Sequence, residues 1–451
     1  MAGLSVDWRM ARLPNGLRLI TIARPETPTV AVRVYVRAGS RYDVPLNGVT
    51  DHSSSVEGPD GVWPTREPDT LERGPLRPIS LLLGLAHFTE HFLFKGTRSH
   101  DQRDLYGAVE RLGGVLDAGT TKEYVTLYAV TQGDGLATAV DVLAEILAEP
   151  ALREEDFWEE KLVVLEEIRR AQDQQSVIFD LFAETIWQRH PLRYPIRGTL
   201  EGLHDLEPAS VIPFYRQRYV AGNALVAVGG DIEHAEVRRL VEQSFASLHA
   251  GPEQAPLPVE EPPLDEPRTA HLDKEVQLTS LLIGVPAVSM KHEDRAAIKV
   301  IERVLGMGGS ARLYQHLREE ARLVYSINTV TAHYEDAGYF AVHTVCDPQN
   351  LGAVQQAILD EWDKLRREGV SADELEAAKS NYAGTQARRA ETNLGVASIF
   401  GVQGLLHRVE TFDEAVARIE AVTRDDVLRV AREYLSLDRY VAVTVGRQAQ
   451  T

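Results

Sequence analysis

The sequence predicts an α+β protein composed of two similar halves that are joined by a proline-rich linker. The chain has 451 residues, enough for two large domains or about three smaller ones. Between residues 251 and 267 prolines alternate with acidic residues, a composition typical of a semi-rigid, extended linker. The order of elements before this break recurs after it, which indicates an internal duplication. We therefore expect domains at residues 1–250 and 268–451.

In the first half, alternating apolar and polar residues predict strands, and apolar residues at helical spacing predict helices. Asn15-Gly16 is a turn signal before the first strand. The predicted strands cover residues 17–22, 29–36, 119–130 and 224–228. The predicted helices begin near residue 81 and then cover residues 101–112, 136–147, 153–175, 178–189, 208–218 and 235–245.

Residues 44–79 differ in character from the segments around them. They hold six prolines, several glycines and three consecutive serines, which predicts a long loop. Loops of this length are either functional lids or disordered insertions in most compact domains. Three roles stay open for this stretch: covering a site, selecting a partner, or none.

The second half repeats the plan of the first. A strand is predicted over residues 277–285 and a helix over 294–305, as after the strand at 29–36. At the far end, a helix through residues 427–434 precedes a strand at 440–445 that ends at a glycine. The first half closes in the same way, with the helix at 208–218 and the strand at 224–228.

Composition excludes several classes of protein. With 48 basic and 67 acidic residues the net charge is -19, which argues against nucleic acid as a partner because such binding relies on Lys and Arg. One cysteine allows neither an intrachain disulfide nor a thiolate zinc cage, and favours a reducing compartment. No apolar run approaches the length of a membrane span, and the first residues lack a signal-peptide core. We expect a cytoplasmic protein without membrane contact.

The most informative segment is Gly84-Leu-Ala-His87-Phe-Thr-Glu90-His91. On a helix, residues three and four apart share a face, so both imidazoles and the carboxylate point the same way. Two imidazoles at this spacing hold one zinc ion in H-x-x-E-H peptidases, and the carboxylate between them takes a proton from a water on the metal. An amphipathic surface helix with two histidines is the alternative interpretation.

A catalytic zinc site needs a third protein ligand. Glu160 and Glu167 lie seven residues apart in a segment with a strong helical pattern and therefore share a face. Glu167 could be the third ligand, with Glu160 accepting a hydrogen bond from a ligating histidine and orienting it. The residues alone leave a second interpretation open, since carboxylates on a helix surface are usually only solvated.

Together these segments resemble the pitrilysin/insulinase family of zinc metallopeptidases, the inverzincins, and in particular the short-chain branch that includes mitochondrial processing peptidase. Three further segments extend the resemblance over both halves: Gly113-Gly-Val-Leu-Asp117-Ala118, Gly306-Met-Gly-Gly309, and Leu317-Arg318 with Tyr325. The resemblance implies two α/β-roll halves, each with a largely antiparallel sheet packed with helices. It also implies a zinc-dependent endopeptidase that cleaves peptides or leader segments inside a dimeric clamshell.

Residue by residue, the resemblance implies one zinc ion per chain, held by His87, His91 and Glu167, with Glu90 as general base and Glu160 behind a histidine. It implies that Arg318 and Tyr325 contact the substrate carbonyl and stabilise the oxyanion, a role suited to a guanidinium and a phenol. Without it, a helix-end arginine and a core tyrosine would be the simpler interpretation of that pair. The helix at 294–305, equivalent to the histidine helix, contains no histidine.

The peptide substrate is expected to add as a strand to an edge that carries Asp117, Ala118 and Tyr128, receiving main-chain hydrogen bonds. Asp117 departs from the family pattern, which has asparagine there. Because one chain carries both the zinc set and the Arg/Tyr pair, a homodimer is expected, and a heterodimer with a related subunit stays open. A non-catalytic partner subunit of a peptide-processing complex is the competing hypothesis.

Overall fold

The protein is described by a computed structural model that covers residues 6–447 apart from 26, 44–56, 59–60, 63–81 and 172. The predicted loop at 44–79 therefore lies almost entirely outside the described residues. Within it, two short strands, β4 (Glu57–Gly58) and β5 (Gly61–Val62), pair as a small hairpin.

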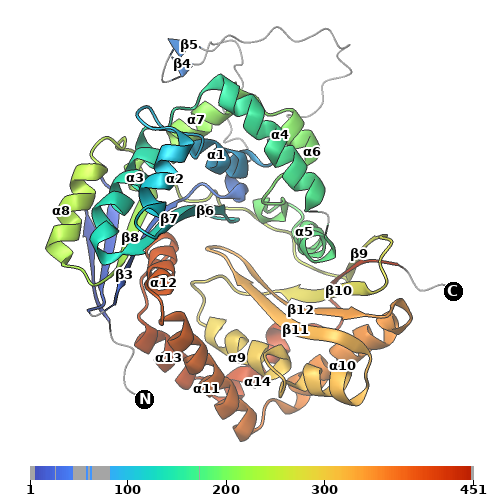
Figure 1. Cartoon of the computed structure of the whole chain (residues 1–451). Helices are drawn as coiled ribbons and strands as arrows, with labels where there is room; N and C mark the ends of the chain where they lie inside the picture. Colours follow the sequence, from blue (N-terminus) through green and yellow to red (C-terminus); the bar gives the residue numbers. More distant parts are fainter. Residues whose placement is uncertain are drawn as a thin grey trace, which may run out of the picture.

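The first half contains a six-stranded sheet in the order β1-β2-β8-β3-β7-β6 (Figure 1). Its strands β2 and β8 are parallel neighbours, and all other neighbours are antiparallel. In chain order the strands are β1 (Asp7–Arg12), β2 (Arg18–Ala23), β3 (Thr29–Val36), β6 (Val115–Thr120), β7 (Val125–Gln132) and β8 (Ala224–Gly230).

The second half contains a five-stranded sheet in the order β9-β13-β10-β12-β11. Its one parallel pair, β9 with β13, has the same place as β2 with β8, and the remaining order matches strand for strand. The strands are β9 (Arg268–Leu272), β10 (Thr279–Pro286), β11 (Val324–His333), β12 (Gly338–Cys346) and β13 (Val441–Val445). The shared topology confirms the two-half α+β fold and the internal duplication.

Helices cover both sheets. Those of the first half are α1 (Leu85–Leu93), α2 (Gln102–Glu110), α3 (Leu136–Ala148), α4 (Glu154–Arg170), α5 (Gln174–Ile186), α6 (Leu200–His204), α7 (Pro208–Arg218) and α8 (His234–Ser244). Those of the second half are α9 (Arg295–Gly306), a π-helical segment (Tyr314–Glu320), α10 (Leu351–Glu368), α11 (Ala372–Arg389), α12 (Asn393–Leu406), α13 (Phe412–Glu420) and α14 (Arg424–Tyr434). Short 3₁₀ turns lie at Ser40–Tyr42, Gly133–Gly135, Pro191–Arg193, Ala221–Asn223 and Pro348–Asn350.

The two halves exchange one helix each. Helix α5 packs on β9, β10 and β13 of the second sheet, where Phe182 lies in a buried cluster with Leu282 and Val443. Helix α12 packs on β2, β3 and β8 of the first sheet, where Phe400 lies in a cluster with Tyr35. Figure 1 shows α12 against the first sheet and α5 beside β9 and β10. Apolar contacts thus cross the linker at 251–267, a segment without helix or strand.

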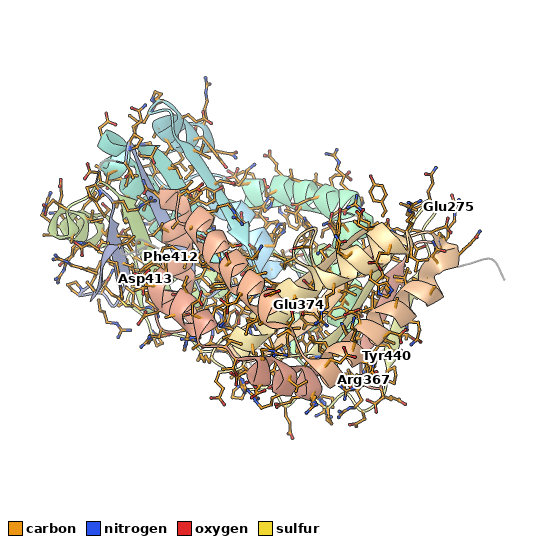
Figure 2. The ribbon with its side chains drawn as sticks, turned by 90° about the horizontal axis from the view of Figure 1, so that it is seen from below. Glu275, Arg367, Glu374, Phe412, Asp413 and Tyr440 are labelled. Carbon is orange, nitrogen blue, oxygen red and sulfur yellow. The ribbon has the colours of Figure 1, made fainter. Side chains whose placement is uncertain are left out.

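The outer face of the second half is covered by α10, α11, α13 and α14, which lie in front of its sheet in Figure 2. Two labelled residues mark helix starts there. Glu374 closes a capping box at the start of α11, and Phe412 begins α13 and packs against Phe400 of α12 with ring centroids 5.8 Å apart. The second half is therefore bound to the first through α12 as well as through the linker.

Two predicted elements need correction, and strand β1 has no counterpart among the predicted elements. The strand predicted over 119–130 is two antiparallel strands, β6 and β7, because the chain turns at residues 121–124, where Thr121 N donates to Tyr124 O. The helix predicted over 153–175 ends at Arg170, and a new helix begins at residue 174, capped by the Asp173 side chain. Strand β1 was not predicted, since its residues are mostly exposed and show no buried face.

Candidate metal centre

Contacts within the protein alone hold helix α1 in place. Its N-cap is Gly84, whose φ of +98° favours glycine, and the carboxylate of Asp43 accepts hydrogen bonds from Gly84 N and Ala86 N at 2.8 Å each. Burial raises the pKa of Asp43 to about 7. On the opposite face of the helix, Phe88 and Phe92 are fully buried against Phe157 of α4, with ring centroids 4.8 and 5.9 Å apart. The packing therefore sets α1 against α4.

This packing brings the three predicted ligands together. Glu167 Oε2 on α4 lies 3.7 Å from His87 Nε2 and 3.4 Å from His91 Nε2. One ligand atom from each residue lies within 4.8 Å of the others. A tetrahedral zinc ion with ligands at about 2.1 Å separates neighbouring ligand atoms by roughly 3.4 Å. The nitrogen and oxygen donors and their spacing fit zinc.

The pKa values of the two histidines are shifted in opposite directions. His91 Nδ1 is 2.9 Å from Glu160 Oε1, and Lys95 Nζ lies 3.3 Å from the other oxygen of Glu160. Burial lowers the pKa of His91, but the Glu160 hydrogen bond and nearby carboxylates outweigh it, so the pKa is raised. Burial and the neighbouring His91 lower the pKa of His87 to about 4. His87 is therefore neutral at pH 7, the form in which imidazole ligates a metal.

Glu90 has the environment expected of a base. It is buried, and Thr120 Oγ1 of β6 donates to its Oε2 at 2.9 Å. Burial raises the pKa of Glu90 above its usual value. It shares with the ligand set a cavity of about 610 Å³ that also reaches Asp117, Ala118 and Thr120. Within the described chain, every residue lining this cavity belongs to the first half.

The predicted substrate strand is the edge of the first sheet. Strand β6 pairs only with β7, so its other edge is free of strand partners within the described sheet, and it lies beside α1 (Figure 1). Asp117 and Ala118 line the cavity, while Tyr128 of β7 does not. Tyr128 contributes indirectly, because its hydroxyl donates to Asp117 Oδ2 at 2.8 Å.

The Arg/Tyr pair lies outside this cavity. Arg318 belongs to the π-helical segment, with its guanidinium 4.9 Å from the Tyr314 ring. Tyr325 is the second residue of β11, the edge strand equivalent to β6, and is 73% exposed. It is therefore not the core tyrosine of the simpler interpretation. Within one chain the structure does not bring this pair to the histidines.

Several residues of the site were missed from the sequence. Thr120 holds Glu90, Asp43 caps α1, and Arg197 Nε lies 2.9 Å from Glu167 Oε1. None of them belongs to a local pattern with the histidine motif, because they come from other segments of the chain. Only the tertiary structure reveals them.

The fold and the site define a class: two-half α+β proteins with an H-x-x-E-H helix and a distal glutamate. Comparisons identify the family. Residues 80–200 match the model described as insulinase (peptidase family M16), and residues 205–382 match that of the peptidase M16 inactive domain. The chain belongs to peptidase family M16, as the sequence resemblance indicated.

Similar proteins and solved structures match nearly the whole length of this chain. A Streptomyces coelicolor protein named an uncharacterized zinc protease is 30% identical over 95% of this chain and 87% of its own length. A Bacillus subtilis protein with the same description is 27% identical over 95% and 96%. The structure of a Helicobacter pylori protease superposes with a TM-score of 0.84 at 24% identity, covering 98% of this chain and all of that one. A Pseudomonas fluorescens structure titled peptidase M16 inactive domain gives 0.83 at 18% identity and 99% coverage of both chains.

Among the described residues, no helix has both the length and the apolar character that a bilayer span requires.

Proposed function

We propose that this protein is a zinc-dependent endopeptidase that cleaves peptides or leader segments. One observation carries the proposal: the donor atoms of His87, His91 and Glu167 converge in the cavity that also holds the buried carboxylate of Glu90. Glu90 is not needed as a ligand and faces the same space. This division between ligands and a free base is what metal-assisted hydrolysis requires.

A zinc ion held by these three residues would lower the pKa of a water toward neutrality and polarise a peptide carbonyl. Glu90 would accept the proton of that water and pass it to the leaving amine, as a general base and then a general acid. Its raised pKa suits the second task, and the Thr120 hydroxyl holds the carboxylate in one orientation. Glu160 would orient His91 through Nδ1, leaving Nε2 for the metal.

The substrate would bind as an added strand on the free edge of β6. Such pairing uses main-chain hydrogen bonds and is tolerant of sequence, while side-chain pockets supply preference. Asp117 and Ala118 would lie directly beneath the peptide, and the hydroxyl of Tyr128 would hold the Asp117 carboxylate. A carboxylate in the place of the family's asparagine favours a basic residue at this position of the substrate.

A second copy of the chain would complete the site. Tyr325 is exposed and Arg318 lies outside the metal cavity, so a partner subunit is the natural source of both side chains. There they would stabilise the oxyanion formed at the scissile carbonyl. A homodimer would then have two sites and one zinc ion per chain, and a heterodimer with a related subunit would have the same geometry. The single cysteine favours a cytoplasmic location.

A peptide-library digest tests this function. Wild type and Glu90→Gln are loaded with zinc, their native masses are measured, and the products of a diverse library are identified by mass spectrometry. Wild type should be dimeric and generate internal cleavages that EDTA abolishes, and Glu90→Gln should generate none. A zinc-loaded wild-type dimer that cleaves nothing would contradict the proposal and favour a non-catalytic partner subunit.

A further inference from the structure

Among the described residues that line the metal cavity, Arg197 is the one cation that touches a predicted ligand, and it was not expected from the sequence. Its Nε lies 2.9 Å from Glu167 Oε1. The other oxygen of the same carboxylate, Oε2, faces His91 Nε2 at 3.4 Å and His87 Nε2 at 3.7 Å. The arginine and the imidazoles therefore divide the two carboxylate oxygens between them.

We propose that Arg197 is a positioning residue for Glu167. It fixes one carboxylate oxygen so that the other is presented to zinc as a single, oriented ligand atom. This inference rests on the proposed function, since it concerns the same metal. Arg197 would orient Glu167 as Glu160 orients His91. Mutating residues that orient a metal ligand in this way typically lowers metal affinity or activity about 10–100-fold.

The backbone around Arg197 supports this role. Gly198 has a φ of +78°, and a Cβ there would lie 2.2 Å from Leu83 O; a Cβ on Gly84 would lie 2.7 Å from Arg197 O. The loop of Arg197 is thus pressed against the first residues of α1. The Lys122 ammonium also donates to Tyr194 O earlier in the same loop. The backbone position from which the Arg197 side chain extends to α4 is therefore fixed relative to helix α1.

The ion pair itself is poorly suited to stabilising the fold. The Arg197 side chain is 41% exposed and that of Glu167 35% exposed, and exposed pairs contribute little to folding stability. Loss of Arg197 should therefore appear in the metal affinity rather than in the melting temperature of the metal-free protein. A second possibility predicts the opposite sign: if the guanidinium acted only as a positive charge, it would repel the zinc ion, and its removal would tighten binding.

The zinc affinity of the whole 451-residue chain, in the assembly that it forms in solution, distinguishes these possibilities. Wild type, Arg197→Gln, Arg197→Lys and Arg193→Gln are stripped of metal and titrated with zinc against a chromogenic chelator. Arg193 is the matched control, because it belongs to the same loop and its nearest carboxylate, Glu184, is 4.0 Å away and is not a metal ligand. Melting in EDTA is recorded for each variant, and cobalt is substituted to follow the d–d spectrum of the ligand set.

We expect Arg197→Gln to weaken zinc binding about 10–100-fold, with a changed cobalt spectrum and an unchanged melting temperature in EDTA. Arg197→Lys should recover part of the affinity and Arg193→Gln should match wild type. Zinc binding by Arg197→Gln within twofold of wild type, or tighter, would overturn the inference. Because binding is measured without peptide, it is separate from the proposed activity: a wild type that binds zinc but cleaves nothing removes the function and leaves Arg197 in its role.

Discussion

Helices α1 and α9 occupy the same place in the two halves, and their side chains differ at the positions that matter for chemistry. Helix α1 packs on β6, α4 and α7, and α9 packs on β11, α11 and α14. The sequence His87-Phe-Thr-Glu90-His91 in α1 matches Lys299-Val-Ile-Glu302-Arg303 in α9. Each glutamate accepts a hydrogen bond from a threonine hydroxyl of the neighbouring edge strand, Thr120 at 2.9 Å and Thr331 at 2.7 Å. The glutamate is kept, and both imidazoles are replaced by cations.

The helices that pack against α1 and α9 also differ in the side chains that they offer to a metal. Helices α4 and α11 correspond with an offset of 218 residues, since Lys161 and Lys379 are buried alike (379 − 161 = 218). The same offset places Ala378 at Glu160 and Thr385 at Glu167. The Thr385 hydroxyl donates to Asn381 O within its own helix, so neither residue offers a carboxylate.

In the second half, the side chains of Lys299 and Arg303 supply the positive charge next to the glutamate. Lys299 Nζ lies 3.1 Å and Arg303 Nη1 3.2 Å from Glu302 Oε2, and Glu302 is only 7% exposed. The first half instead gathers carboxylates and imidazoles in a cavity, an arrangement that a bound cation would complete. One framework therefore carries either a candidate metal site or an internal ion pair, depending on a few side chains.

Matched substitutions of the two glutamates should give the largest difference between the halves. Glu90→Gln should lower kcat by about 10²–10⁴-fold, because general acid–base catalysis contributes about this much. Glu302→Gln should retain peptidase activity, since every partner of the Glu302 carboxylate among the described residues belongs to the second half. Both variants are assayed on one fluorogenic peptide, with zinc content measured alongside. Equal activity losses in the two variants would contradict the division of roles.

Substituting Lys299 tests whether the ion pairs of Glu302 stabilise the second half. Lys299→Met leaves the buried Glu302 with one cation fewer, and losing one partner of a buried pair costs about 3 kcal/mol. The free energy of unfolding from urea titration should fall by about that amount. Lys364→Met, at an exposed position of α10, is the control and should change stability by less than about 0.5 kcal/mol. A Lys299→Met variant as stable as the control would mean that the ion pair is dispensable.

The contact between the halves can be weakened at Asp336. Its two oxygens lie 3.0 and 2.7 Å from the buried Arg41 guanidinium. Burial raises the pKa of Asp336, but hydrogen bonds with His190 and Arg41 outweigh it and hold this pKa well below its usual value. A depressed pKa in the folded state stabilises above the unfolded pKa of about 3.9, and the contribution is lost as the pH falls below it.

Asp336→Asn should therefore lower the free energy of unfolding by about 2 kcal/mol at pH 7, because the buried Arg41 guanidinium loses the charge of one of its two carboxylate partners and keeps that of Glu123. At pH 3 the difference between variant and wild type should be smaller, since protonation of Asp336 is already under way on unfolding. Urea unfolding at both pH values measures the two differences. A difference that grows on acidification would show that the sign of the linkage is wrong.

Zinc affinity should depend on pH through His91 rather than His87. The pKa of His91 is raised, so zinc must displace a proton from it once the pH falls below that value, whereas His87 stays neutral down to about pH 4. Affinity should therefore fall about tenfold per pH unit on the acid side of the His91 pKa. Chelator competition from pH 8 to 5.5 measures this slope, and a flat profile would rule out the proton competition. Glu160→Gln should move the onset to lower pH, because it removes the partner that favours the imidazolium.

The sequence was sufficient for the parts of the site that depend on local spacing. His87, Glu90 and His91 share a helix face by periodicity alone, and topology confirmed the duplicated α+β fold. Glu167 could be named as a possible third ligand from its spacing to Glu160, but the family resemblance was needed to prefer this role over a solvated carboxylate, because the histidine helix is far away in sequence. Arg197 could not be predicted at all, since a loop packed against Gly84 brings it to Glu167.

Errors in the predicted elements have similar causes. The turn between β6 and β7 reads Thr-Lys-Glu-Tyr and has neither glycine nor proline to mark it. The exchange of α5 and α12 is invisible in the sequence, because an apolar helix face does not specify which sheet it covers. Tyr325 could be placed on a strand but not on the surface, since aromatic residues in strands are more often buried.

A zinc-edge anomalous difference map from crystals of the zinc-loaded protein tests the central claim most directly. The predicted result is one peak per chain, bounded by His87 Nε2, His91 Nε2 and Glu167 Oε2, and no peak between Lys299 and Arg303. A map without a peak at the three predicted ligands, or with zinc bound elsewhere in the chain, would contradict it.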